Sequence, residues 1–179
     1  DASVLAAIDF HAVMKNILQV RPQTDHIVIV LGASPLEQYW AGQMRIEIEP
    51  LKSEVSFTWF NDLAFNEMLK RVAALSPTSG AVFFAAMVVD AAGVPQNDGK
   101  TLSRIRAASA APVFSFEDSY FGAGLVGGPM ISIAGICRQV ADAAARILAG
   151  ETPANVVTPP VGFSPPRFDW RELQRWSVE

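Results

Sequence analysis

Short runs of apolar residues alternate with amphipathic stretches along most of the chain. The first run, His26 to Leu31, is rich in β-branched residues and ends at Gly32, as is typical of a strand buried on both faces of a parallel sheet. Comparable runs predict strands over residues 55–60, 81–89 and 113–116. The alternation with helices predicts an α/β fold: an open, mostly parallel sheet with helices on both faces.

Apolar residues at helical spacing predict the connecting helices. The helix after the first strand has the clearest start, because Ser34 can cap it, Pro35 suits its first position and Glu37 can complete a capping box. Asn61 and Asp62 offer cap chemistry for the helix after the second strand. The helix after the first strand is predicted over residues 34–49, and three further helices are predicted over residues 3–20, 100–108 and 132–149.

Proline changes the character of the chain after Thr152. Five prolines between residues 153 and 166 suit an extended edge segment and not a central strand. The tail DWRELQRW predicts one helical turn capped by Asp169. We therefore expect an α/β lobe over residues 1–150, followed by an extended segment and a C-terminal turn over residues 151–179.

Composition and charge exclude several classes of protein. Half of the 179 residues are hydrophobic and 18% are charged, which indicates a globular chain. The net charge is -4 and the 14 lysines and arginines form no run, so no nucleic-acid partner is expected. The only cysteine, Cys137, excludes an internal disulfide, and His11 and His26 are too few for a multi-histidine metal site. We expect structural or incidental roles for these three residues.

Neither a membrane span nor a leader is predicted. Residues 119–137 carry no charge, but their glycines and Pro129 interrupt any helix, so this segment does not suit a bilayer. The first twenty residues lack a basic region and contain Asp9 and Lys15 among their apolar residues, unlike a signal peptide.

The common sequence motifs for cofactors and catalysis are absent. After the first strand the chain reads GASPLEQYW, which contains neither a dinucleotide-binding nor a P-loop glycine motif, and there is no GxSxG elbow. The clustered acids of a response-regulator receiver are also missing at this point. We therefore expect no cofactor and no catalytic residue, with an enzyme of flavodoxin-like architecture as the alternative.

The residues that follow the predicted strands are candidates for ligand binding, because ligands of open parallel sheets bind at the carboxyl ends of the strands. Capping is the alternative role for Ser34 and Asp62, and core packing is the alternative for Tyr39 with Trp40. Asp90 and Asp118 can also be solvated loop or turn carboxylates. We expect Asp62 and Asp118 to follow adjacent or next-neighbour strands. The candidate ligand-binding residues are Ser34, Pro35, Tyr39, Asn61, Asp62, Asp90, Asp118, Ser119 and Tyr120.

Five segments in order resemble type I periplasmic binding proteins. They are IVIVLGASPLEQYW, VSFTWFNDLAFNEMLKRVAALSP, GVPQNDGKTLSRI, PVFSFEDSYFGAGLVGGPMIS and AARILAGETP. The stretch from Asp118 to Gly128, with the later ARILAG, is similar to the final part of a solute-binding subgroup whose domains are also fused to bacterial histidine kinases. The closing PPRFDWRELQRW is similar to the end of those sensor domains.

The resemblance implies a two-lobed protein in which this chain begins just before the second, flavodoxin-like lobe. It also implies a hinge near Gly127 and Gly128, after which the helix over residues 132–149 packs with the missing first lobe. Without that lobe, the helix must pack on its own sheet, on a second copy of the chain, or on nothing. We expect self-association, because its apolar stripe otherwise lies in water. The stripe consists of Ile136, Val140, Ala144 and Ile147.

The function implied by the resemblance is the sensing of a small molecule by the extracytoplasmic domain of a histidine kinase. The parent protein would be anchored in the inner membrane, and this domain would be periplasmic and non-catalytic. The alternative is the solute-binding component of an ABC transporter, and the further alternative is the flavodoxin-like enzyme. The expected partners are a small-molecule ligand, the first lobe and, in a homodimer, a second copy.

Overall fold

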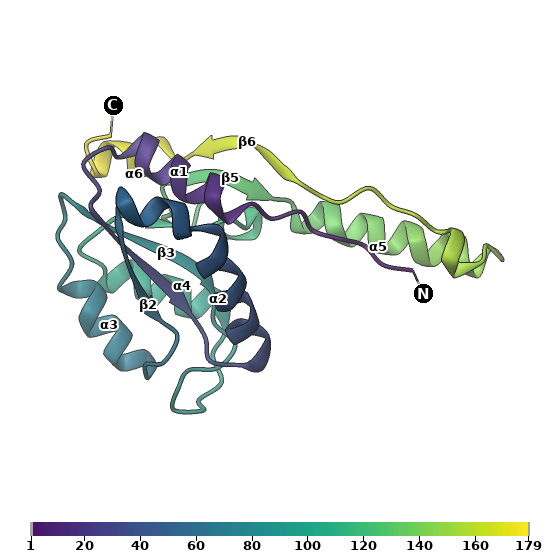
Figure 1. Ribbon diagram of the computed structural model, residues 1–179, viewed down its shortest axis with the longest axis horizontal. Coiled ribbons are helices and arrows are strands. Elements are labelled where there is room, and N and C mark those ends of the chain that lie inside the picture. The colour runs from purple at the N-terminus through teal and green to yellow at the C-terminus, as the bar shows by residue number, and fades with distance from the viewer. Residues whose placement is uncertain (1, 179) are drawn as a thin grey trace.

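The computed structural model describes residues 2–178 and contains the expected parallel sheet (Figure 1). Its strand order is β2-β1-β3-β4. The register places Ile27 of β1 beside Phe57 of β2 and beside Ala81 of β3, so β1 and β3 are the inner strands. The strands are β1 (His26–Leu31), β2 (Ser56–Phe60), β3 (Gly80–Ala86) and β4 (Val113–Phe114). The predicted α/β architecture is confirmed.

Helices cover both faces of this sheet because successive residues of β1 point to opposite sides. Ile27 and Ile29 lie in a buried cluster with residues of α1 (Phe10–Val20) and α2 (Pro35–Glu47). Val28 and Val30 lie in a second cluster with residues of α3 (Phe65–Ala73) and α4 (Asp98–Ala108). All of these strand side chains are fully buried, which explains the uninterrupted apolar run in the sequence.

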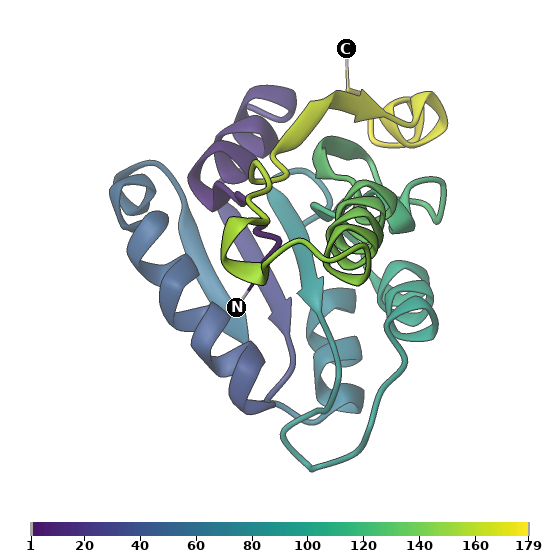
Figure 2. The ribbon, with the colours of Figure 1, turned by 90° about the vertical axis from the view of Figure 1, so that its right-hand side faces the viewer.

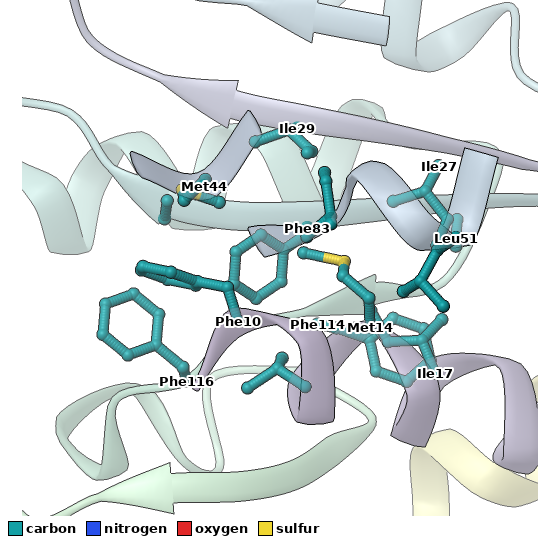
Figure 3. Close-up of a cluster of buried hydrophobic side chains, with 14 of the residues drawn as sticks. Phe10, Met14, Ile17, Ile27, Ile29, Met44, Leu51, Phe83, Phe114 and Phe116 are labelled. Carbon is teal, nitrogen blue, oxygen red and sulfur yellow. The ribbon is translucent and has the colours of Figure 1, made fainter. Parts of the chain in front are cut away.

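Aromatic rings fill the first cluster, which Figure 3 shows in close-up. The ring of Phe10 meets the ring of Phe116 edge-on, with centroids 5.5 Å apart, and meets that of Phe83 at 6.5 Å. Trp40 is tilted against Phe116 at 6.4 Å. These contacts join the beginning of α1 to the inner strand β3 and to the segment after β4.

A second, antiparallel pair of strands lies beside the main sheet and was not predicted. It consists of β5 (Gly127–Ile131) and β6 (Phe163–Phe168), where β6 realises the expected proline-rich edge segment. Gly127 has φ +116°, and a Cβ on it would overlap the carbonyl of Arg167. Only glycine suits this position, so the Gly127-Gly128 pair allows β6 to approach β5 closely. The predicted C-terminal turn is confirmed as α6 (Trp170–Arg175), with Asp169 accepting from Arg171 N.

The helix predicted over residues 132–149 is confirmed as α5 (Ile133–Leu148), with Ser132 Oγ accepting from Gly135 N at 3.1 Å. It extends away from the sheet, as Figure 1 shows, so packing on its own sheet is not the arrangement adopted. Ala143 is the buried residue of this helix, whereas Val140 is half-exposed and Leu148 is exposed. The stripe residues Val140, Ala144 and Ile147 line an open hollow of about 240 Å³ together with Ala143 and residues 2–4.

Two helix starts differ from the prediction. Residues 3–9 are extended and not helical, because Ala7 N donates to Val161 O and Val161 N donates to Leu5 O. Asp9 then caps α1 by accepting from Ala12 N at 2.8 Å.

Further along, α3 begins at Phe65 and not directly after Asn61 and Asp62. The remaining short elements are 3-10 helices, namely η1 (Glu49–Ser53), η2 (Asp118–Tyr120) and η3 (Pro153–Asn155).

Within residues 2–178, no helix combines the length and the apolar character needed to cross a bilayer.

Candidate functional site

The four parallel strands end at the same edge of the sheet, and the loops that follow them carry the candidate residues. Figure 2 shows β1 and β3 ending above the long loop that leads from β3 to α4. We call the edge of the sheet where these strands end, together with the loops that follow them, the carboxyl edge. The N-terminal segment and α5 lie on the side of the molecule that faces the viewer in Figure 2.

At the end of β1, Ser34 forms the predicted capping box. Its Oγ accepts from Glu37 N at 3.3 Å, and Glu37 Oε2 accepts from Ser34 N at 3.0 Å. Glu37 is only 3% exposed, and its Oε1 also accepts from Val88 N at 2.7 Å. A Cβ on Gly32 would overlap this carboxylate, so a larger residue there would displace it from its two N–H donors. The carboxylate of Glu37 therefore ties the beginning of α2 to the loop after β3.

Asp90, in the loop after β3, caps α3 from a distance in the sequence. Its Oδ2 accepts from Phe65 N at 2.9 Å, and its Oδ1 accepts from Ala92 N and Val94 N at 3.0 and 2.9 Å. Burial disfavours the charged form, but these backbone N–H donors outweigh it and hold the pKa of Asp90 below its ordinary value. Both oxygens are thus used within the lobe. The alternative for Asp90 is confirmed as far as a turn carboxylate goes, since Oδ1 bonds the turn at Ala92 and Val94, but this carboxylate is buried and not solvated.

Asn61, at the end of β2, is buried and bonded to α2. Its Nδ2 donates to Gln38 Oε1 at 2.9 Å, and Gln38 Nε2 donates to its carbonyl at 3.1 Å. Asp62 is exposed. The N-cap of α3 is Ala64, whose side chain makes no capping bond. The cap expected from Asn61 and Asp62 is therefore wrong, since Asp90 takes that place.

The residues after β4 contact either the start of α5 or the core. Asp118 Oδ1 accepts from Ile133 N, the first residue of α5, at 3.0 Å. Ser119 is exposed and donates to Glu117 Oε2 at 3.2 Å. The ring of Tyr120 meets that of Phe84 edge-on at 5.8 Å, so this tyrosine packs on the α3 and α4 side of the sheet.

The expectation that Asp62 and Asp118 follow adjacent or next-neighbour strands is wrong. Asp62 follows β2 and Asp118 follows β4, and these are the outermost strands of the order β2-β1-β3-β4. The two residues share the carboxyl edge but stand at its opposite ends. Two inner strands separate them because the chain begins in the middle of the sheet and adds strands on either side.

Apolar side chains occupy the exposed part of α2 at this edge. Pro35, Leu36 and Tyr39 are exposed, whereas Trp40 is partly buried against Phe116. Core packing is thus confirmed for Trp40, whereas Tyr39 is exposed and its part in an aromatic wall stays a prediction. An open hollow of about 210 Å³ lies beside them, and we call it the α2 groove. Its lining residues are Ala6, Ile8, Phe10, Tyr39, Trp40 and Gln43. Sequence reasoning missed Leu36 and Val88, although Leu36 shares a helical face with Tyr39.

A larger polar hollow of about 470 Å³ lies between the end of α4, residues 122–124 and α6. Its charged groups are paired with one another: Arg171 NH2 lies 2.8 Å from Asp169 Oδ2, and Arg106 NH2 lies 3.3 Å from Glu172 Oε1. These pairs attach α6 to the lobe. Among residues 2–178 there is no group of three or more histidines, cysteines or acids that could hold a metal ion.

Comparison with known proteins identifies the fold. No family model matches the sequence, and no curated protein matches it. A conserved domain protein from Vibrio cholerae superposes with a TM-score of 0.72 at 15% identity. The ABC domain in complex with L-Trp from Streptococcus pneumonia gives 0.69 at 16% identity, and a ligand-free, open substrate-binding protein with adhesive properties from Clostridium difficile gives 0.64 at 11%. Each match covers 99% of this chain but 58% of the other, so the chain has the fold of one part of these proteins.

Proposed function

We propose that this chain is one lobe of a solute-binding domain, which holds a small organic molecule between this lobe and a second one. The observation that carries the proposal is that three separate segments run together between the sheet and α5 (Figure 1). They are residues 2–9, the connection from β5 to α5, and residues 156–162. Ala6 pairs with Val161, and Glu117 pairs with Ile131, both in parallel bridges. Several connecting segments that cross side by side from one body to another are suited to act as a hinge between the two bodies.

The position of α5 supports a second lobe on the side of the carboxyl edge. The helix extends on the same side of the molecule as the beginning of α2 (Figure 1). Its stripe of Val140, Ala144 and Ile147 faces an open hollow, and burial of a large aliphatic side chain contributes about 1.5–3 kcal/mol. A first lobe built around α5 would bury this stripe and would place the ligand at the carboxyl edge.

Binding would act by closing the two lobes. A ligand that contacts both lobes binds the closed arrangement more tightly than the open one, and it shifts the population by that difference in affinity. In this proposal Asp118 joins the edge to the hinge, since its carboxylate accepts from the backbone N–H of Ile133, the first residue of α5. No covalent step is proposed for these residues, and the role is binding and not catalysis.

The neighbours in fold favour the solute-binding component of an ABC transporter, since two of them are described as an ABC domain with L-Trp and as a substrate-binding protein. An extracytoplasmic location is part of this proposal. The sensor domain of a membrane-anchored histidine kinase is the second candidate, and its support is the resemblance of the closing PPRFDWRELQRW to such domains. A transmembrane segment and a histidine-containing dimerisation domain encoded downstream would identify the sensor; a transport operon without them would identify the transporter component.

A thermal-shift screen of small metabolites on the full-length protein tests the proposal. A ligand at 100 times its Kd adds about 2.7 kcal/mol of stability and raises Tm. The Val88→Arg variant places a long charged side chain at the carboxyl edge and should abolish the shift, because Val88 is half-exposed there. Glu67→Gln on the outer surface of α3 should leave it unchanged. A shift that survives Val88→Arg would place the ligand elsewhere and contradict the proposal.

A further inference from the structure

Polar side chains near the middle of the carboxyl edge are already bonded within the lobe. The Glu37 carboxylate holds two backbone N–H groups, and that of Asp90 holds three. The Asn61 amide is paired with Gln38. These three side chains are also 3–7% exposed, so a ligand has little access to them, and pulling one away would leave a buried backbone donor unpaired at a cost of about 1–3 kcal/mol. The composition of the edge as read from the sequence therefore overstates its polarity.

The exposed side chains at the centre of this edge include three large apolar or aromatic ones, whereas the exposed Asp62 and Ser119 lie towards its two ends. Leu36 and Tyr39 of α2 are each 62% exposed, and Val88 after β3 is 55% exposed. The bond from Val88 N to the Glu37 carboxylate brings the loop after β3 against the first turn of α2. Leu36, Tyr39, Trp40 and Gln43 follow i, i+3, i+4 and i+7 spacing, so they share one face of α2.

This face continues into the α2 groove, where Tyr39 and Trp40 also belong to the lining. Ile8 and Ala6 of the N-terminal segment form one side, and Tyr39 and Trp40 form the other. Trp40 is held by Phe116, whose ring in turn contacts Phe10. At about 210 Å³ the groove is below the size of a complete small-molecule pocket, as expected of one half of a site between two lobes.

We propose that this half of the site receives a flat apolar ring, so that the ligand belongs to the aromatic or heteroaromatic compounds. The inference rests on the proposed function and specifies its ligand class. A ring laid against Tyr39 would gain from aromatic contact as well as from burial. A sugar would lose water from most of its hydroxyls in this groove, because few polar groups of the lining side chains, such as the Tyr39 hydroxyl and the Gln43 amide, can replace that water. The polar groups of the ligand would then form hydrogen bonds at the rim of the groove and with the second lobe.

The test uses indole and ribose as probes on the full-length protein, with saturation-transfer NMR to detect contact and calorimetry to measure Kd. Indole should bind and ribose should not. Tyr39→Ala should weaken indole binding at least ten-fold, whereas Tyr39→Phe, which retains the ring, should bind within about two-fold of the wild type. Trp170→Ala is the matched control, because Trp170 is equally exposed but lies on α6. Since Tyr39 is 62% exposed, Tyr39→Ala should leave Tm unchanged, which separates a binding effect from unfolding.

Three outcomes would overturn the inference. If ribose or another sugar binds and indole does not, the ligand class is wrong while the proposed function stands. If indole binds with the same Kd to Tyr39→Ala, its site is not the α2 groove, and the direct closure of the first lobe onto this face becomes the explanation of the exposed side chains. If neither the probes nor any compound of the metabolite screen binds, the inference and the proposed function both fail.

Discussion

Replacing Glu37 with glutamine tests the bonds that join two loops of the carboxyl edge. The carboxylate accepts from Val88 N at 2.7 Å through one oxygen and from Ser34 N at 3.0 Å through the other, and the side chain is 3% exposed. Glutamine keeps one oxygen but turns an NH2 group towards the second N–H. One buried donor then loses its acceptor and faces another donor.

The expected loss of stability follows from these contacts. A hydrogen bond to a charged group contributes about 1.5–3 kcal/mol, and an unpaired buried donor costs about 1–3 kcal/mol. Glu37→Gln should therefore lower the free energy of unfolding by about 2–3 kcal/mol. Glu37→Ala, which leaves both donors unpaired and opens space beside Gly32, should lower it by about 4 kcal/mol.

Urea unfolding followed by circular dichroism measures these differences, with Glu49→Gln as the matched control. Glu49 pairs with Lys52 on the surface, and exposed pairs of this kind contribute about 0–1 kcal/mol. The control should therefore unfold nearly as the wild type does. A Glu37→Gln variant within about 0.5 kcal/mol of the wild type would refute the reasoning, because that is the range of substitutions without a structural role.

Three further substitutions test other parts of the lobe. Ser34→Ala removes the N-cap of α2 and should cost about 1 kcal/mol in urea unfolding; an unchanged midpoint would argue against the cap. Because the folded pKa of Asp90 is lowered, its charge stabilises the fold above the ordinary aspartate pKa of about 3.9, and this contribution is lost as the pH falls through the folded pKa. The stability gap between wild type and Asp90→Asn should thus be wide at pH 7 and narrow at pH 3, and a gap that is independent of pH would contradict this. Arg21→Met leaves the carbonyls of Pro77, Thr78 and Trp176 without their donor, so it should cost about 3 kcal/mol and speed hydrogen exchange in α6; unchanged exchange there would show that Arg21 does not hold the helix.

Local signals in the sequence predict the elements well. The β-branched run of β1 and the cap of α2 depend on neighbours within a few residues, and both are found where expected. The same holds for Ser132, which caps α5 through Gly135 N. Element type is readable because the apolar period and the cap chemistry lie within one turn or one strand.

Contacts between distant residues explain what the sequence did not reveal. Residues 3–9 carry apolar residues at helical spacing, yet they pair with the segment at Val161 and remain extended. Asp90 caps α3 from 25 residues away, so the acids closest to the helix are not its cap. The strand order, which separates Asp62 from Asp118, likewise depends on pairing that no local pattern encodes.

The loops that carry the candidate residues lie at one edge of the sheet, as expected, because parallel strands end on the same side. Whether these residues bind a ligand stays a prediction, and their bonding partners differ from what residue type suggested. Residue type could not show that Asn61 and Asp90 use their polar atoms within the lobe. Nor could it show that Leu36 and Val88 face solvent, since exposed and buried aliphatic residues look alike in a sequence. The helical spacing of Leu36 and Tyr39 was the one signal that could have found this face.

Hydrogen exchange of the full-length protein, with and without the strongest hit of the metabolite screen, tests the central claim most directly. The claim is that a small molecule binds at the carboxyl edge of this lobe and closes a second lobe over it. The account predicts slower exchange in residues 33–40, 87–94 and 117–133 and along α5, with little change in the outer helices α3 and α4. Protection confined to α3 and α4, or to the hollow beside α6, would contradict the account.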